Sequence, residues 1–231
     1  MCVYIFKRYE LKYLISKSQF NDLIPLIESN MKKDEYGIST IQSLYYDTDN
    51  YQIIRRSLEK PAYKEKLRLR SYNQVKDGDT VFVELKKKSD GVVYKRRSEY
   101  TFSSNYDFSL SNLNNSQIDK EIDYFVNHYE SLSKKFLLIY DRLAYFGKDN
   151  LRVTFDTNIR YRVDNLSLNN ELVGKKILSD DLLLMEIKAS DSFPMWLVKE
   201  LSQLQIKKVS FSKYGTAYQD YMISKGGHNY V

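Results

Sequence analysis

Charged and apolar positions alternate along several segments of the chain, and the segment from residue 64 to 72 shows the pattern most fully. Its cationic positions are Lys64, Lys66, Arg68 and Arg70, and the positions between them are Glu65, Leu67 and Leu69. Successive side chains of a strand point to opposite faces of the sheet. This period of two therefore predicts a β-strand with one strongly cationic face.

The same alternation recurs elsewhere in the chain. Charges fall on a single strand face in four further sets: Arg8, Glu10 and Lys12; Glu84, Lys86 and Lys88; Lys95, Arg97 and Glu99; Glu186 and Lys188. The opposite faces are apolar, with Leu67, Leu69, Val83, Leu85, Leu183 and Ile187. Strands are expected over residues 4–15, 39–48, 64–72, 80–88, 91–102, 136–146, 151–163 and 182–190.

Apolar residues at helical spacing predict helices between these strands. The first begins at Ser16 or Ser18 and carries Pro25, which predicts a kink or a short first turn. The others are expected over residues 51–60, 118–132, 196–204 and 214–223. Each of the longer helices has an apolar stripe that needs an apolar surface to cover.

A sheet with one charged face and one apolar face can be covered by these helices on its apolar side. Closing such a sheet places the charged face inside and removes the strand edges. We therefore predict an α+β fold, an antiparallel β-barrel tunnel with a charged lumen and helices packed outside. No repeat or linker divides the sequence, so residues 1–231 are expected to form a single domain.

Composition narrows the class of protein. The 36 basic residues are mixed with 30 acidic ones for a net charge of +6, unlike the one-sided excess of a nonspecific nucleic-acid tail. The single cysteine, Cys2, excludes an intramolecular disulfide or a cysteine metal cluster and fits a reducing cytoplasm. The apolar run Val3 to Phe6 is too short for a signal peptide, and no run is long enough to span a membrane. We assign no role to Cys2, His128 or His228.

The aligned cations raise the question of a ligand. Like charges about 7 Å apart on one strand face repel by about 2 kcal/mol at an effective dielectric constant near 20. A solvated surface face is the simpler interpretation of any one strand, but the recurrence of the pattern favours a tunnel that binds a polyanion. The glutamates in Glu10-x-Lys12, Glu84-x-Lys86 and Glu186-x-Lys188 could hold a divalent metal, or they could form cross-strand ion pairs.

An ordered set of short motifs resembles a known family. The motifs are RYELKYLI, KLRLRSY, VFVELKKK, VYKRRS, YDRLAY, RVTFD, MEIK and FSKYG, and they run from about Arg8 to Tyr218. In this order they resemble the VTC domain, the polyphosphate polymerase module within the triphosphate tunnel metalloenzyme superfamily. The resemblance implies an antiparallel β tunnel, a triphosphate or polyphosphate ligand, and Mn²⁺ or Mg²⁺ as cofactor.

The resemblance also implies site residues. It implies catalytic roles for Arg68, Arg70, Lys86, Arg142 and Arg152, substrate binding by Lys12, Lys95, Ser212 and Lys213, and metal binding by Glu186, to which we add Glu10. The chain departs from the family pattern in two places. Arg8 stands where the cyclase and thiamine triphosphatase branch has glutamate, which favours the polymerase branch. Ser210 stands where a further lysine is expected, and Lys208 is a candidate substitute.

The expected reaction is transfer of the γ-phosphoryl group of ATP to a growing polyphosphate chain. An inorganic triphosphatase or nucleoside triphosphatase would use the same lumen with water as acceptor. A noncatalytic nucleic-acid-binding domain is the alternative from another class, suggested by the many tyrosines. Tyr9 and Tyr13, however, alternate with charges and so belong on the apolar face, and no nucleic acid is expected. A membrane-protein partner and the oligomeric state stay open.

Overall fold

The computed structural model describes residues 9–90, 92–104, 116–190 and 192–226. Cys2, Arg8 and His228 lie outside these residues. The strands are β1 (Tyr9–Ser16), β2 (Lys32–Asp47), β3 (Tyr63–Tyr72), β4 (Thr80–Ser89), β5 (Val92–Thr101), β6 (Ser133–Phe146), β7 (Arg152–Arg162), β8 (Lys175–Lys176) and β9 (Leu182–Ala189). The helices are α1 (Lys17–Asn30), α2 (Gln52–Leu58), α3 (Gln117–His128), α4 (Met195–Gln203) and α5 (Lys213–Ser224).

The strands form one antiparallel sheet in the order β1-β9-β7-β6-β2-β3-β4-β5, with β8 paired to β7. The predicted α+β class and the helix-covered antiparallel sheet are confirmed. The expected closure into a barrel is wrong for the described part of the chain, where no pairing joins β1 to β5. The outer edge of β1 meets the chain near Lys208 instead, through a bridge from Tyr13 and a hydrogen bond from the Val209 N–H to the Lys12 carbonyl oxygen.

The chain divides into two compact units. Unit 1 comprises residues 1–39, 140–159 and 178–212, and unit 2 comprises residues 40–139, 160–177 and 213–231. Three long strands, β2, β6 and β7, contribute residues to both units. That residues 1–231 form a single domain stays a prediction.

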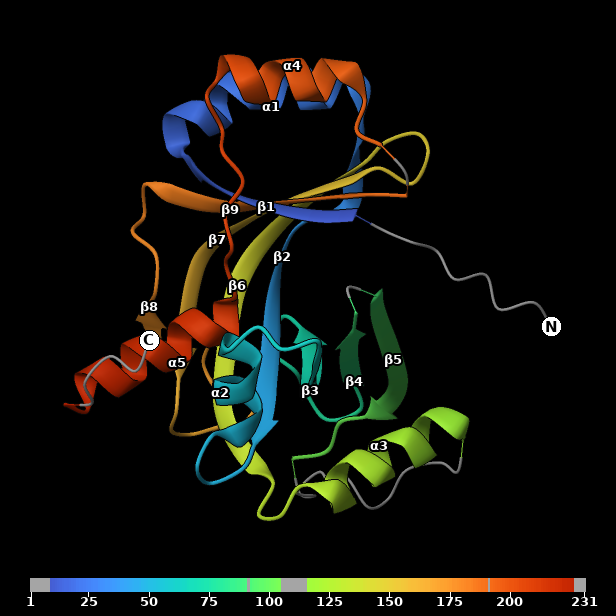
Figure 1. Cartoon of the computed structure of the whole chain (residues 1–231), viewed down its shortest axis with the longest axis vertical. Helices are drawn as coiled ribbons and strands as arrows, with labels where there is room; N and C mark the ends of the chain where they lie inside the picture. Colours follow the sequence, from blue (N-terminus) through green and yellow to red (C-terminus); the bar gives the residue numbers. More distant parts are fainter. Residues whose placement is uncertain (1–8, 91, 105–115, 191, 227–231) are drawn as a thin grey trace. The chain divides into compact units, whose positions relative to one another are not determined.

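In unit 1, helices α1 and α4 lie side by side over β1 and β9 (Figure 1). Helix α1 begins with a capping box, in which Ser16 and Gln19 satisfy each other's backbone N–H groups. Its Leu23 and Ile27, one helical turn apart, are fully buried against the apolar face that includes Leu183 and Ile187. Pro25 lies within α1 on the exposed side, so the helix continues past it to Asn30.

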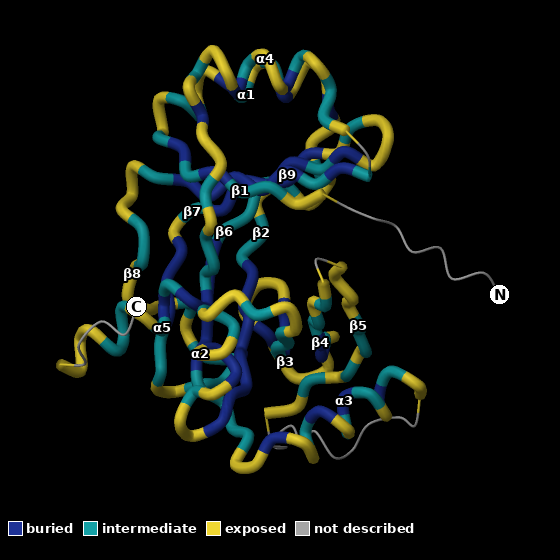
Figure 2. Tube along the Cα trace, in the orientation of Figure 1, coloured by how far each residue is buried: buried dark blue, intermediate teal, exposed yellow. Residues whose placement is uncertain are grey.

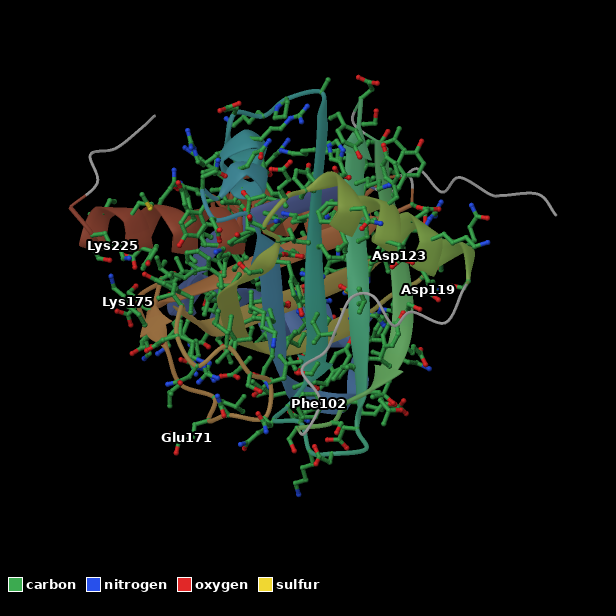
Figure 3. All side chains as sticks on the ribbon, turned by 90° about the horizontal axis from the view of Figure 1, so that it is seen from below. Phe102, Asp119, Asp123, Glu171, Lys175 and Lys225 are labelled. Carbon is green, nitrogen blue, oxygen red and sulfur yellow. The ribbon has the colours of Figure 1, made fainter. Side chains whose placement is uncertain are left out.

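In unit 2, α3 covers the apolar face of the meander formed by β3, β4 and β5. Ile122 and Phe125 of α3 pack in one cluster with Leu67, Leu69 and Leu85, as the alternation predicts. Asp119 completes the capping box of α3 and also accepts hydrogen bonds from Ser98 and Tyr100 of β5, which fixes the helix to the strand. Figure 3 shows Asp119 and Asp123 on this helix.

A second group of side chains in unit 2 joins α2 and α5 to β2 and β6. Ile54 of α2 and Ala217 of α5 pack there with Phe136 and Leu138 of β6. Figure 2 shows buried residues along β2 and β6 beside these helices. The two helices are therefore held by an apolar cluster separate from the one under α3.

The structure differs from the sequence-based predictions in a few elements. Strand β2 starts at Lys32, before the predicted residue 39, in a polar stretch that has no alternation. The two-residue strand β8 lies in a segment for which no strand was predicted. Tyr9 and Tyr13 lie on the same face of β1, as predicted, but only Tyr13 is buried, whereas Tyr9 is 47% exposed at the start of the strand.

Candidate functional site

The charged face of unit 2 brings three lysines into one row across three strands. Lys86 of β4 lies directly opposite Lys66 of β3 on one side and Lys95 of β5 on the other. Directly opposed residues of like charge destabilise a sheet, because their Cβ atoms are only about 5 Å apart. An anion over this row would remove the repulsion.

The next row of the same face is centred on a buried carboxylate. Glu84 is 2% exposed and lies between Arg68 and Arg97 in the strand register. Arg68 donates from Nε and Nη2 to Oε2 at 2.8 and 2.6 Å, and Arg97 donates from Nε to Oε1 at 2.8 Å. Lys95 Nζ lies 2.8 Å from Oε1 and Arg70 Nη1 lies 3.7 Å from Oε2. Four cations thus surround one carboxylate, which leaves a net positive charge of three.

The cluster shifts the pKa values of its members. Burial alone would raise the pKa of Glu84, but Arg68, Arg70 and Lys95 outweigh it and hold that pKa well below its usual range. Loss of hydration lowers the pKa of Lys95 to about 8, against the opposing effect of Glu84 and with Arg97 and Arg70 adding to the decrease. Glu84 is therefore an anion under all ordinary conditions, whereas Lys95 loses charge in mildly alkaline solution.

In unit 1, two carboxylates and two lysines alternate across β1 and β9. Lys12 lies opposite Glu186 and Glu10 lies opposite Lys188. The Lys12 Nζ atom is 3.9 Å from a Glu10 oxygen and 3.8 Å from a Glu186 oxygen, and Lys188 Nζ makes contacts of 3.8 and 3.9 Å with the same two carboxylates. Cross-strand ion pairing of Glu10 and Glu186 is therefore present in the structure. The same contacts bring the two proposed metal ligands together.

Arg142 lies on the part of β6 that belongs to unit 1 and is held by an aspartate. Its Nε and Nη2 atoms donate to the two carboxylate oxygens of Asp156 at 2.6 and 2.7 Å. Burial would lower the pKa of Arg142, but Asp156 outweighs it, with Tyr140 and Glu186 adding, and the pKa rises well above its usual value. Arg142 stays cationic, and its field acts on the Glu186 carboxylate.

The remaining predicted residues lie at defined positions in the fold. Arg152 of β7 is opposite Lys188 of β9, and its guanidinium lies 4.9 Å from the centre of the Phe146 ring. Ser212 directly precedes α5, and Lys213 is the first residue of that helix. Lys12 Nζ donates to the Phe211 carbonyl oxygen at 2.9 Å, which ties β1 to the segment before Ser212.

The structure groups the predicted residues into two clusters. In unit 2, Arg68, Arg70 and Lys95 meet at Glu84 with Lys86 in the adjoining row. In unit 1, Lys12 contacts both Glu10 and Glu186. The sequence analysis assigned no site role to Arg97, Lys188 or Asp156, which contact the predicted residues, although it placed the first two on charged faces. It also gave no role to Tyr45, whose hydroxyl accepts a hydrogen bond from Arg68. Among the described residues, no group of three or more histidine, cysteine or acidic side chains is arranged to hold a metal ion. The assigned roles stay predictions.

A family model for the VTC domain matches residues 7–222 of the sequence, which is nearly the whole chain. The chain belongs to the VTC domain family. This match confirms the family that the ordered motifs predicted. Comparison of this VTC domain with curated protein sequences gives no match.

Solved structures share the fold of this VTC domain at low sequence identity. A candidate adenylate cyclase from Bacillus halodurans is similar with a TM-score of 0.54 and 15% identity, over 88% of this chain and 92% of the other. A candidate adenylyl cyclase from Hippeastrum, described as having a dominant triphosphatase activity, is similar with a TM-score of 0.51 and 15% identity, over 96% of this chain and 97% of the other. These likenesses show that the chain shares the overall fold of these two proteins. No helix in the described part of the VTC domain has the length and apolar character needed to cross a membrane.

Proposed function

We propose that this VTC domain is a polyphosphate polymerase that transfers the γ-phosphoryl group of ATP to a growing inorganic polyphosphate chain. The observation that carries the proposal is the excess of cations around Glu84. Four basic side chains share one carboxylate, and a row of three opposed lysines adjoins them. Such a surface is repulsive when empty and favourable when it binds a chain of phosphates, each of which carries negative charge.

The proposed mechanism depends on binding and orientation. Phosphoryl transfer passes through a transition state with charge spread over the equatorial phosphate oxygens, so fixed cations stabilise it without a side-chain nucleophile. Arg68 and Arg70 are proposed to contact the reacting phosphates, together with Lys86, Arg142 and Arg152. Arg68 is held in place by Glu84 and Arg142 by Asp156, so neither guanidinium has to be ordered when the substrate binds. Lys12, Lys95, Ser212 and Lys213 are proposed to bind the rest of the phosphate chain.

Glu10 and Glu186 are proposed to hold a divalent cation. Carboxylate oxygens are the ligands that Mg²⁺ and Mn²⁺ prefer, and Mg²⁺ is commonly bound by one or two carboxylates together with substrate phosphates. The carboxylates of Glu10 and Glu186 are therefore ligands of the right chemical type for Mg²⁺ or Mn²⁺. A bound cation would neutralise charge on the phosphate oxygens, while Lys12 and Lys188, within 4 Å of both carboxylates, keep the two side chains ordered.

Replacing Glu186 with alanine is expected to abolish metal-dependent activity and to preserve or strengthen binding of inorganic triphosphate without metal. A carboxylate beside phosphates is repulsive unless a cation lies between them, and removing that of Glu186 leaves Lys12 and Lys188 with Glu10 as their one shared carboxylate, so more of their positive charge acts on the phosphates. Titration calorimetry with and without Mn²⁺ measures both effects. Glu200→Ala, on the opposite, helical side of unit 1, is the matched control. Equal metal affinity in the Glu186 variant and the wild type would reject Glu186 as a ligand.

The reaction itself is tested by incubating the protein with ATP and Mn²⁺ and separating the products on a polyphosphate gel. A ladder of phosphate polymers with stoichiometric release of ADP supports the polymerase. Orthophosphate without polymer would instead support a triphosphatase that uses water as acceptor. Comparing Mn²⁺ with Mg²⁺ in the same assay identifies the preferred cation.

Ligand binding is also expected to stabilise the fold in an order set by the chemistry of the ligand. A ligand that binds only the native state adds about 2.7 kcal/mol at a hundredfold excess over Kd, or several degrees in melting temperature. Inorganic triphosphate and short polyphosphate should do this strongly, orthophosphate weakly, and single-stranded DNA of matched charge little. Differential scanning fluorimetry measures the shifts. Equal stabilisation by DNA and triphosphate would favour the nucleic-acid-binding alternative.

The cellular setting of the reaction is a further part of the proposal. The resemblance to the VTC domain family is the ground on which we propose a cytoplasmic catalytic domain that works with a membrane-protein partner. Copurification of the protein with membranes before and after a high-salt wash tests for such a partner.

A further inference from the structure

Two adjacent tyrosines of β2, Tyr45 and Tyr46, point to opposite faces of the sheet. Tyr46 lies opposite Leu67 and packs in the apolar cluster under α3. Tyr45 lies opposite Arg68 on the charged side, and its hydroxyl oxygen accepts a hydrogen bond from Arg68 Nη1 at 3.0 Å. A phenol group therefore touches a guanidinium that is proposed to bind phosphate.

The ring of Tyr45 has little freedom to move. It is 5% exposed and stacks on the Tyr214 ring of α5, with ring centres 4.4 Å apart and planes 17° from parallel. The Tyr214 hydroxyl donates to Asp47 Oδ2 at 2.8 Å, and Asp47 also accepts the backbone N–H groups of Ile53 and Ile54 in α2. Two helices thus fix the position of the Tyr45 hydroxyl.

Arg68 is therefore held from two sides. Glu84 of β4 binds its Nε and Nη2 atoms, and Tyr45 of β2 binds its Nη1 atom. A guanidinium has five N–H donors, and these contacts use three of them. The orientation of the other donors follows from the two anchors, because the guanidinium is planar and rigid.

We propose that Tyr45 is a positioning residue for phosphate binding, which orients the Arg68 guanidinium while its hydroxyl is neutral and weakens phosphate binding when the hydroxyl is deprotonated. This inference rests on the proposed function, because it assumes that Arg68 binds phosphate. A phenolate would pair with Arg68 as Glu84 does and would add a negative charge beside the bound phosphates. Tyr45 would then reduce phosphate affinity in alkaline solution.

The surroundings of Tyr45 make this ionisation accessible. Burial would raise the pKa of Tyr45, but Arg68, Lys66 and Arg70 of β3 outweigh it and lower that pKa to about 8. The other titratable groups that face the phenol are Tyr214 of α5, stacked on its ring, and Asp47, which is held by Tyr214. Glu84 acts on it through the shared Arg68. Lys95 has a pKa of about 8 as well, so wild-type affinity should fall with pH for two reasons.

The test compares Tyr45→Phe with wild type and with the control Tyr46→Phe, using inorganic tripolyphosphate in metal-free buffer and titration calorimetry. At about pH 7, one unit below the pKa of Tyr45, Tyr45→Phe should bind roughly five- to tenfold more weakly, because the hydrogen bond to Arg68 is lost. At about pH 9 the difference should vanish or reverse. Lys95 and the ligand titrate in the same way in both proteins. Dividing the affinity of Tyr45→Phe by that of the wild type at the same pH therefore removes their effect. Tyr46→Phe should follow the wild type at both values.

A difference that is the same at both pH values would show a merely structural contribution and overturn the inference, as would the absence of any difference. Failure of the wild type to bind tripolyphosphate at either pH would overturn the proposed function, and this inference with it. The phenyl ring of Tyr45→Phe can still stack on Tyr214, so the substitution removes only the hydroxyl group.

Phenolate absorbance gives a second measurement. The wild type and Tyr46→Phe should show one tyrosine ionising near pH 8, and Tyr45→Phe should lack it. Its persistence in Tyr45→Phe would assign the titration to another tyrosine and contradict the inference.

Discussion

Replacing Arg68 with alanine is expected to reduce polyphosphate synthesis by roughly 30- to 1000-fold, the effect of losing on the order of 2 to 4 kcal/mol of transition-state stabilisation. The fold should survive, because the side chain lies on the charged face and Glu84 retains Arg70, Lys95 and Arg97 as partners. Arg70→Ala is expected to behave in the same way. Initial rates of polymer formation measure the effect on catalysis, and melting temperatures measure the effect on stability.

Arg96 provides a matched control for the Arg68 variant. It is the neighbour of Arg97 on β5 but faces the other side of the sheet, where its Nε atom binds Glu121 of α3 at 3.1 Å. Arg96→Ala removes a guanidinium group from the same meander but leaves the residues around Glu84 unchanged, so polyphosphate synthesis should stay near the wild-type rate. Wild-type turnover in both Arg68→Ala and Arg70→Ala would reject the assignment of the charged face as the site.

Replacing Glu84 with glutamine is expected to destabilise the ligand-free protein by about 3 to 5 kcal/mol, the usual cost of removing one partner from a buried ion pair. The substitution keeps the shape of the side chain but leaves Arg68, Arg70, Lys95 and Arg97 without their shared carboxylate. For a chain of this size the melting temperature should fall by roughly 6 to 20 °C. Saturating tripolyphosphate should recover more stability in this variant than in the wild type, because the polyanion replaces the missing charge.

The pH dependence of this difference follows from the lowered pKa of Glu84. A carboxyl group whose pKa is lowered by folding stabilises the protein fully above its unfolded pKa, about 4.3, and loses that contribution as the pH falls toward the folded pKa. The difference in the free energy of unfolding between wild type and Glu84→Gln should therefore be constant from neutral pH to about pH 5 and should shrink in more acidic solution.

The exposed Glu99 of β5 serves as the control for the Glu84 variant, because its conversion to glutamine removes the same charge from the adjacent strand. Surface substitutions of this kind usually change stability by less than about 0.5 kcal/mol. A Glu84→Gln protein as stable as Glu99→Gln, with no larger response to tripolyphosphate, would show that Glu84 does not balance the cations.

Much of the fold follows from local pattern. The alternation at Lys66, Leu67, Arg68 and Leu69 predicts both the strand and its two faces, because the side-chain period of two is a property of extended backbone. The apolar stripe of α3 predicts Ile122 and Phe125 in the core, where both are buried. Ser16 and Ser116 begin helices through capping boxes that depend on residues only three positions away. The motifs could predict the family because each of them consists of consecutive residues and can be read without knowledge of the fold.

Pairing between distant segments was decided by the tertiary structure alone. The sequence shows that Glu84, Arg68 and Arg97 each lie on a charged face, but only the strand register makes one carboxylate the partner of several cations. Arg142 and Asp156 are both visible in their motifs, yet their two-oxygen contact requires β6 and β7 to lie together. Closure of the sheet was predicted from the faces of single strands, which carry no information on what meets the outer edges of β1 and β5.

Tyr45 and Tyr46 show the division most directly. The sequence by itself determined that these two identical neighbours point in opposite directions, because successive residues of a strand always do. Only the tertiary structure decided which of them joins the core and which meets Arg68, since that choice depends on β3 lying beside β2 in one register. A shift of one residue would exchange the two faces and reverse their roles. The charged face is thus a property of the sequence, whereas the site is a property of the register between strands.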